Sequence, residues 1–273
     1  MPTTTDFPFK CGKADAEYRA SDPLFTSFRD ASQAVSVTVP TVFGHGNSFQ
    51  EWGMNGNDDW GDCVFAGGAH ETELLTNLAA GGVVGQKVVT IGANESLSDY
   101  SAVTGFNINA GSPGENPTDQ GTNVHAAMEY RIKTGLLDST GKRHKIAGFV
   151  ALEPGNLEHL RHALYIFEAV GIGFQVPRSA QEQFSRNQVW QVVAGNQEIV
   201  GGHYVPLVGV PAVGNLACVT WAKRQVMTDG FFEKYCDEAY AYITEEELNR
   251  KSQANWGGFN WSALKEYLQS AGN

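Results

Sequence analysis

Apolar residues along this chain recur at helical spacing in the first half, and they form strand-like runs in the second. Between residues 62 and 80 they repeat every three or four positions, which predicts a buried helix that Asp62 caps and that ends near Gly81 and Gly82. Further helices are expected at 97–103, 123–134, 156–169, 245–251 and 260–268. Strands are expected at 34–39, 145–152, 171–176, 203–210, 216–222 and 239–243, and 231–238 is helical or irregular. Helices followed by strands favour an α+β fold over a regularly alternating parallel-sheet fold.

Proline and glycine divide the chain into three parts. Residues 1–45 contain spaced prolines and are expected to form an N-terminal arm, while residues 46–250 hold most of the predicted elements and form the main domain. Residues 251–273 are expected to be a helical extension packed on that domain. No internal repeat or low-complexity tract interrupts this organisation.

Composition excludes several classes of protein. Of 273 residues 42% are hydrophobic, which argues against disorder, and a net charge of −11 without a Lys/Arg run argues against a nucleic-acid partner. No apolar stretch is long enough for a membrane span, and the absence of a secretory signal predicts a cytoplasmic or virion-associated protein. The four cysteines form no CxxC pair, so neither a disulfide framework nor a metal site is expected, and no cofactor is implied.

Cys63 is the most informative cysteine because it opens the predicted helix after Asp62. The positive end of a helix favours a thiolate, and its free N–H groups can hold a developing oxyanion. Asp62 acts in the opposite direction, since a neighbouring carboxylate raises the pKa of a thiol. A buried structural cysteine is the alternative interpretation.

His203 is the candidate base, because it starts an apolar strand directly after two glycines, Gly201 and Gly202. A hydrogen-bonded sheet histidine is the alternative. His70 follows Cys63 by two helical turns, about 10.5 Å along the axis, which is too far for direct proton transfer. We therefore expect His70 to pack near the site rather than to act in it.

Together these segments resemble the papain family of cysteine peptidases, in a divergent form similar to papain-fold proteins of bacteria and phages. Asn57 precedes Cys63 with five residues between them, in the way that a family Gln precedes its Cys, and Gly61 matches a family glycine. Thr220-Trp221 resembles the Ser-Trp of the family's Asn-Ser-Trp-Gly motif. The segments 119–135 and 148–173 resemble further family elements in the same order.

The resemblance implies a two-lobe fold, with a helical lobe around Cys63 and an antiparallel sheet lobe that carries His203. It also implies a Cys63–His203 catalytic dyad, with an oxyanion hole formed by the Cys63 N–H and the Asn57 side chain. Trp221, Gly61 and Gly202 would line the cleft.

Three departures from the family pattern bear on activity. Val219 occupies the position of the Asn that orients the histidine, so this third member is lost, and strand alternation is expected to point Thr220 away from the side shared by Val219 and Trp221. Asn57 is one methylene shorter than the family Gln. No long propeptide precedes the domain, and the first 40 or so residues are expected to be a short arm and not an inhibitor.

The sequence thus predicts a cysteine hydrolase that acts on a peptide or protein substrate, slowly or on a specialised target. The alternative is a catalytically weakened structural or binding protein of the same fold, in a phage particle or assembly, with a protein partner bound through residues 1–50. Acyl transfer by the same dyad is a third possibility.

Overall fold

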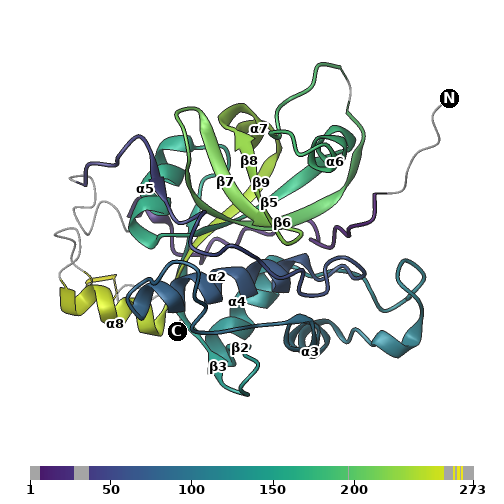
Figure 1. The fold of residues 1–273 in the computed structure, drawn as a ribbon, viewed down its shortest axis with the longest axis horizontal. Coiled ribbons are helices and arrows are strands. Elements are labelled where there is room, and N and C mark those ends of the chain that lie inside the picture. The colour runs from purple at the N-terminus through teal and green to yellow at the C-terminus, as the bar shows by residue number, and fades with distance from the viewer. Residues whose placement is uncertain are drawn as a thin grey trace.

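The computed structural model describes residues 7–27, 37–195 and 197–254, with positions 261, 263, 264 and 266. In Figure 1 the described chain forms a helical lobe beneath a lobe built around a twisted sheet. The helical lobe contains α2 (Cys63–Ala79), α3 (Ala93–Thr104), α4 (Val124–Lys133), the 3₁₀ turn η2 (Ile108–Ala110) and the hairpin of β2 (Leu136–Leu137) with β3 (Arg143–His144).

The sheet lobe is antiparallel throughout, in the order β4-β9-β5-β6-β7-β8, with the short β1 also paired to β6. Its strands are β1 (Phe43–Gly44), β4 (Ile146–Leu152), β5 (Val170–Pro177), β6 (Ile199–Val210), β7 (Asn215–Thr220), β8 (Lys223–Thr228) and β9 (Cys236–Thr244). The accompanying helices are α5 (Leu157–Phe167), α6 (Arg178–Ser185), α7 (Asp229–Tyr235) and α8 (Glu245–Ala254).

The central helix α2 is buried along nearly its whole length. Its first two turns are apolar or small, whereas its later turns bury polar side chains such as Glu71 and Glu73 that pair with cations from neighbouring segments. Gly67 lets it approach the sheet closely, because a Cβ there would lie 2.6 Å from the Tyr204 ring. A charged network also joins the lobes at this contact. Glu71 of α2 lies 2.6 Å from Arg131 of α4 and accepts a 2.7 Å hydrogen bond from the Tyr204 hydroxyl.

Most predicted elements are confirmed, including the α+β class and the helix that follows Asp62. The expectation that Asp62 caps this helix is wrong, because its side chain makes no capping hydrogen bond. The helix that was expected at 97–103 begins earlier than expected. Gly92 and Glu95 form a capping box, so α3 starts at Ala93. The helix α6 and the strand β8 were not predicted. Of the expected strand at 34–39, residues 34–36 lie outside the described residues, and residues 37–39 are not in a strand, so the prediction is wrong there. Most of the expected helix at 260–268 also lies outside the described residues. None of the described helices has the length and apolar character of a membrane span.

Candidate active site

Cys63 is the first residue of α2, and the loop before it is held from the helical lobe. The Gly61 N–H donates to both carboxylate oxygens of Asp119 at 3.1 Å, and the Tyr100 hydroxyl donates to the same carboxylate at 2.7 Å. A tyrosine on α3 therefore sets, through Asp119, the position at which the helix begins. The Cys63 side chain is 1% exposed.

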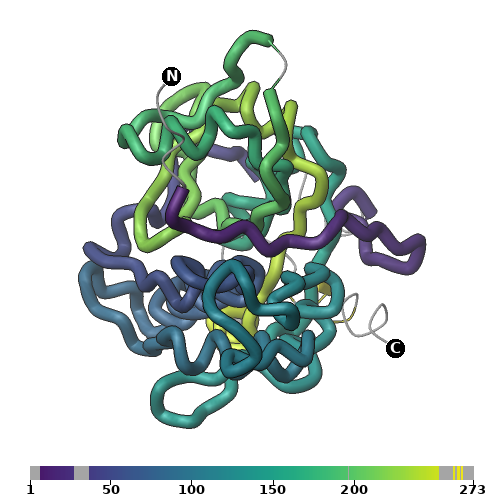
Figure 2. The backbone as a smooth tube through the Cα atoms, turned by 90° about the vertical axis from the view of Figure 1, so that its right-hand side faces the viewer, coloured from purple at the N-terminus to yellow at the C-terminus, as the bar shows by residue number. Residues whose placement is uncertain are grey.

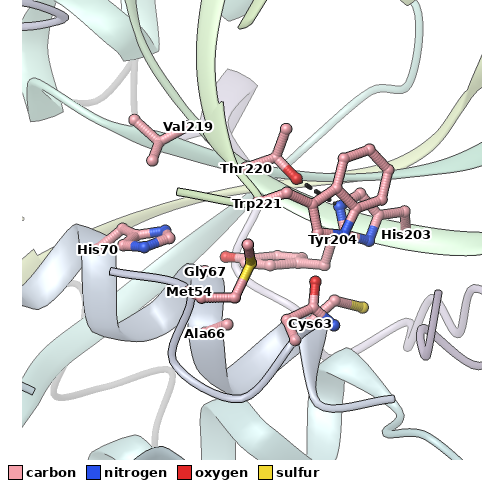
Figure 3. A pocket seen from close by; sticks show the side chains of 11 residues that line it. Met54, Cys63, Ala66, Gly67, His70, His203, Tyr204, Val219, Thr220 and Trp221 are labelled. Atoms are coloured by element: carbon pink, nitrogen blue, oxygen red, sulfur yellow. Dashed lines mark hydrogen bonds between the residues drawn. The ribbon is translucent and has the colours of Figure 1, made fainter. Parts of the chain in front are cut away.

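His203 lies on β6 and lines the same pocket as Cys63, so the two residues predicted to meet do come together (Figure 3). Its Nε2 is 2.7 Å from the Thr220 hydroxyl, whereas its buried Nδ1 has no hydrogen-bond partner among the described residues. When Nε2 carries the ring proton, the Thr220 hydroxyl accepts it and Nδ1 is left as an unprotonated base.

The expectation that Thr220 points away from His203 is wrong, and the reason lies in the backbone. The strand β7 ends at Thr220, and the next residues, Trp221 and Ala222, have φ of 43° and 60°. Strand alternation therefore stops before Trp221, and Thr220 shares a side with Trp221 rather than opposing it. Val219 packs in the apolar cluster beside α2 instead, and the hydroxyl one residue later contacts the imidazole.

Trp221 covers the histidine as expected. Its ring stacks on the His203 ring with centroids 4.3 Å apart and planes inclined by 16°. The indole and the surrounding residues leave His203 only 1% exposed. This burial lowers the pKa of His203 to about 3.

Burial also raises the pKa of the Cys63 thiol to about 12, and the neighbouring Asp62 adds to that rise. Hydrogen bonds from backbone groups of Tyr204 and Gly12 lower this pKa, so they come from N–H groups that favour the thiolate. Both members of the pair are consequently neutral at pH 7 in this arrangement.

Asn57 also lines the pocket, where an oxyanion donor was predicted. One of its amide N–H groups donates to the Trp60 carbonyl at 3.0 Å, and the amide also faces the buried Asp62 carboxylate. Gly61 lies on the loop before Cys63 and Gly202 directly before His203 on β6, but neither glycine is among the residues that line the pocket of the pair. Both instead contact the N-terminal arm, at Gly12 and Lys13.

His70 does not join the pair. Its Nε2 is 2.8 Å from the Gly53 carbonyl, and burial lowers its pKa to about 4. This agrees with the expectation that it packs near the site. In the described part of the chain, no three His, Cys, Asp or Glu side chains are grouped to hold a metal ion.

Residues 7–14 of the N-terminal arm run between the two lobes (Figure 2), which the sequence did not predict. Their hydrogen bonds to Asn57, Trp221 and Gly202 place them across the pocket of Cys63 and His203. The Lys10 N–H donates to the Asn57 carbonyl at 3.1 Å, and the Lys10 carbonyl accepts from the Trp221 indole at 3.3 Å. Two residues further on, Gly12 packs so tightly on Gly61 that an added Cβ would lie 1.8 Å from the Gly61 carbonyl oxygen.

The arm pairs with both lobes as an additional strand at Lys13. Its N–H donates to the Gly202 carbonyl at 3.0 Å on the sheet side. On the helical side, Thr122 donates to the Gly12 carbonyl at 2.7 Å and accepts from the Ala14 N–H at 2.9 Å. Hydrogen bonds to both walls hold the arm in extended form.

Aromatic side chains anchor the arm beyond the pair. Phe9 stacks on Trp221 with centroids 5.7 Å apart, and Phe7 meets Trp221 edge-on at 4.9 Å, with Phe184 of α6 completing the cluster. With the arm in place, the pocket at Cys63 and His203 encloses about 10 Å³, roughly the size of one water molecule. Residues 7–14 therefore occlude the pocket, whereas the sequence suggested only a short arm.

Comparison with solved structures decides the fold. Xylellain, a cysteine protease from Xylella fastidiosa, superposes with a TM-score of 0.62 at 13% identity, over 86% of this chain and 96% of that one. A procathepsin B from Trypanosoma congolense gives 0.59 at 14% identity, over 86% of each chain. This chain has the papain-like fold. A Carica candamarcensis cysteine protease, solved with E-64, gives 0.51 at 13% identity, over 75% of this chain and 99% of its own. No model of a known protein family matches the papain-like chain, and no curated protein sequence does either.

Thr220→Val is expected to lower kcat/KM about 10-fold, because the isosteric side chain leaves Nε2 without a partner and the ring less well oriented. The measurement is peptide hydrolysis across pH in a chain whose arm has been displaced, and the midpoint of the acidic limb should move as well. Thr220→Ser, which keeps a hydroxyl, should restore most of the rate, and the exposed Thr90→Val serves as a matched control. Equal rates for Thr220→Val and Thr90→Val would show that the hydroxyl does not position His203.

Proposed function

We propose that this chain is a latent cysteine hydrolase that cleaves peptide or other amide bonds after its N-terminal arm leaves the site. The observation that carries the proposal is the pocket shared by Cys63 and His203, in which Thr220 holds Nε2 and Nδ1 is left without a partner.

In this mechanism His203 Nδ1 takes the thiol proton as the Cys63 sulfur attacks the substrate carbonyl carbon. The backbone N–H of Cys63 holds the resulting oxyanion, together with the Asn57 amide once this amide turns away from Asp62. The imidazolium then gives its proton to the leaving amine as the C–N bond breaks, which leaves a thioester on Cys63. Water, deprotonated by His203, hydrolyses the thioester and releases the acid and the free thiol. Throughout, Thr220 keeps the ring orientation and Trp221 shields it from bulk water.

Latency follows from the arm. The arm presents the Gly12 N–H to the sulfur, so the thiol faces a hydrogen-bond donor rather than a carbonyl carbon. The burial that the arm imposes also disfavours the thiolate and the imidazolium together. Moving the arm admits water and substrate, and both effects are relieved.

The test uses the full-length chain with Gly12→Ala, a substitution that the contact with Gly61 cannot accommodate. This chain should release new amino termini from unfolded casein, and adding Cys63→Ala should abolish that release while leaving the melting temperature nearly unchanged. Product analysis in the presence of an added amine separates hydrolysis, which yields a free carboxylate, from acyl transfer, which yields an amide. Absence both of turnover and of iodoacetamide labelling at Cys63 would favour a binding protein of the same fold.

A further inference from the structure

The Lys13 side chain leaves the arm and enters a closed acidic pocket in the sheet lobe. Its Nζ lies 2.9 Å from a Glu238 oxygen and 3.2 Å from an Asp237 oxygen, and it donates to the Ala14 carbonyl at 2.8 Å. The Lys13 side chain is 0% exposed and the Glu238 side chain 2% exposed. A buried cation thus meets two carboxylates beside the candidate active site.

Two glycines, Gly173 and Gly202, leave the room that the Lys13 residue occupies. A Cβ on Gly173 of β5 would lie 2.6 Å from Lys13 Cδ and 2.6 Å from Glu238 Cγ, so a larger residue would fill the pocket. A Cβ on Gly202 would lie 2.4 Å from the Lys13 carbonyl oxygen. We call the space bounded by Gly173, Gly202, Asp237 and Glu238 the acidic pocket.

The acidic pocket adjoins the reacting groups. Lys13 directly follows Gly12, whose N–H faces the Cys63 sulfur. The backbone at Lys13 is bound by the Gly202 carbonyl, one residue before His203, and is flanked by the two hydrogen bonds of Thr122. Any extended peptide that replaces the arm and uses these backbone groups places a side chain at the same opening.

Carboxylates buried at this point require a cation. Glu238 is almost inaccessible to solvent, and apart from the Lys13 ammonium its described hydrogen-bonding partner is the Tyr240 hydroxyl at 3.4 Å. Removing a partner from a buried charge is costly, whereas an apolar pocket would hold an arm without that cost. The negative charge of the pocket therefore favours the entry of a positively charged side chain over an apolar one.

We infer that the acidic pocket determines substrate specificity, and that after the arm leaves it takes a lysine or arginine side chain close to the bond that is cut. This inference rests on the proposed hydrolase function. It makes basic peptides and proteins the preferred substrates, and it makes Lys13 the occupant that imitates them.

The test of turnover uses the Gly12→Ala chain and fluorogenic peptide amides that differ at one position. Lysine, arginine, norleucine or glutamate is placed in turn at each of the three residues before the scissile amide. At one of these positions kcat/KM for lysine should exceed that for norleucine about 10-fold or more, and glutamate should be worst. Adding Glu238→Gln should bring the ratio near unity, whereas Glu233→Gln, at an exposed carboxylate on α7, should leave it unchanged. Equal rates for lysine and norleucine at all three positions would overturn the inference.

A binding test separates this inference from the proposed function. Calorimetry measures the affinity of the Gly12→Ala, Cys63→Ala chain for a synthetic peptide of residues 7–18 that carries either lysine or norleucine at position 13. The lysine peptide should bind about 10-fold or more tightly, and Glu238→Gln should remove that preference. If Glu238→Gln does not fold, Asp237→Asn replaces it, because that side chain is 23% exposed and tolerates the change better. Equal affinity of the two peptides would refute the inference that the acidic pocket prefers a basic side chain, even if the chain hydrolyses amides. A preference for the lysine peptide without any turnover would support that inference and contradict the hydrolase function.

Discussion

Gly12→Ala is expected to raise the rate at which iodoacetamide labels Cys63 at neutral pH about 100-fold or more. The substitution puts a methyl group 1.8 Å from the Gly61 carbonyl oxygen. The nearest atoms all belong to the Gly61 backbone, so no side-chain rotation can relieve the clash. The arm must therefore shift away from Cys63, and solvent reaches the thiol. The Cys63 pKa of about 12 in the covered state then falls toward its ordinary value, and the reactive thiolate fraction rises about tenfold for each unit of that fall.

Mass spectrometry of the labelled peptide gives the rate at Cys63 separately from the other cysteines. The matched control is Gly230→Ala on α7, where an added Cβ meets no atom within 4 Å and the labelling rate should equal that of the unchanged chain. If Gly12→Ala and Gly230→Ala label alike, the arm does not protect the thiol. Rapid labelling of the unchanged chain would lead to the same conclusion.

Arg131→Met should lower the free energy of unfolding by about 3–5 kcal/mol at pH 7. The Glu71 carboxylate is 0% exposed and lies 2.6 Å from the arginine, in the contact between α2, α4 and the sheet. The substitution leaves this buried carboxylate without a cationic partner. Burial already raises the pKa of Glu71 while Arg131 lowers it, so removing the arginine raises that pKa further. A carboxyl group with a raised folded-state pKa costs stability as pH rises above its unfolded value, so the loss should be smaller near pH 5 than at pH 7.

Urea unfolding followed by fluorescence measures this loss. Adding Glu71→Gln to Arg131→Met should recover a large part of it, since the stranded charge is then gone. The exposed Arg178–Glu198 pair provides the matched comparison, because Arg178→Met should cost less than about 1 kcal/mol. Similar losses for Arg131→Met and Arg178→Met would show that the buried pair has no special role in joining the lobes.

The sequence predicted those parts of the fold whose signals are local. Asp62 and the apolar spacing after it indicated α2, and Asn123 and Gly135 marked the ends of α4, where the Asn123 side chain caps the helix. The strand β8 was missed because it begins with exposed Lys223 and Arg224 at the edge of the sheet, so it lacks an alternating pattern. The helix α6 was missed because its short polar sequence resembles a loop.

The candidate site was predicted where sequence motifs carried it and missed where it depended on distant contacts. Cys63 and His203 stood out by their local context, and they do line one pocket. The role of Thr220 depended on a left-handed turn at Trp221, a non-glycine residue whose sequence does not announce a positive φ. The pairing of Lys13 with Glu238 joins opposite ends of the chain, and only the folded arrangement of the arm reveals it.

The covalent attachment of the arm affects how this protein could be inhibited or activated. Because the occluding segment belongs to the same molecule, it competes with any ligand of the pocket at an effective concentration on the order of millimolar, independent of how dilute the protein is. Dilution therefore cannot release it, and a separate peptide of the same sequence would be a poor competitor in the intact chain. Cutting the connection beyond the segment that contacts the lobes would turn this unimolecular equilibrium into an ordinary dissociation, after which dilution alone would favour the open site.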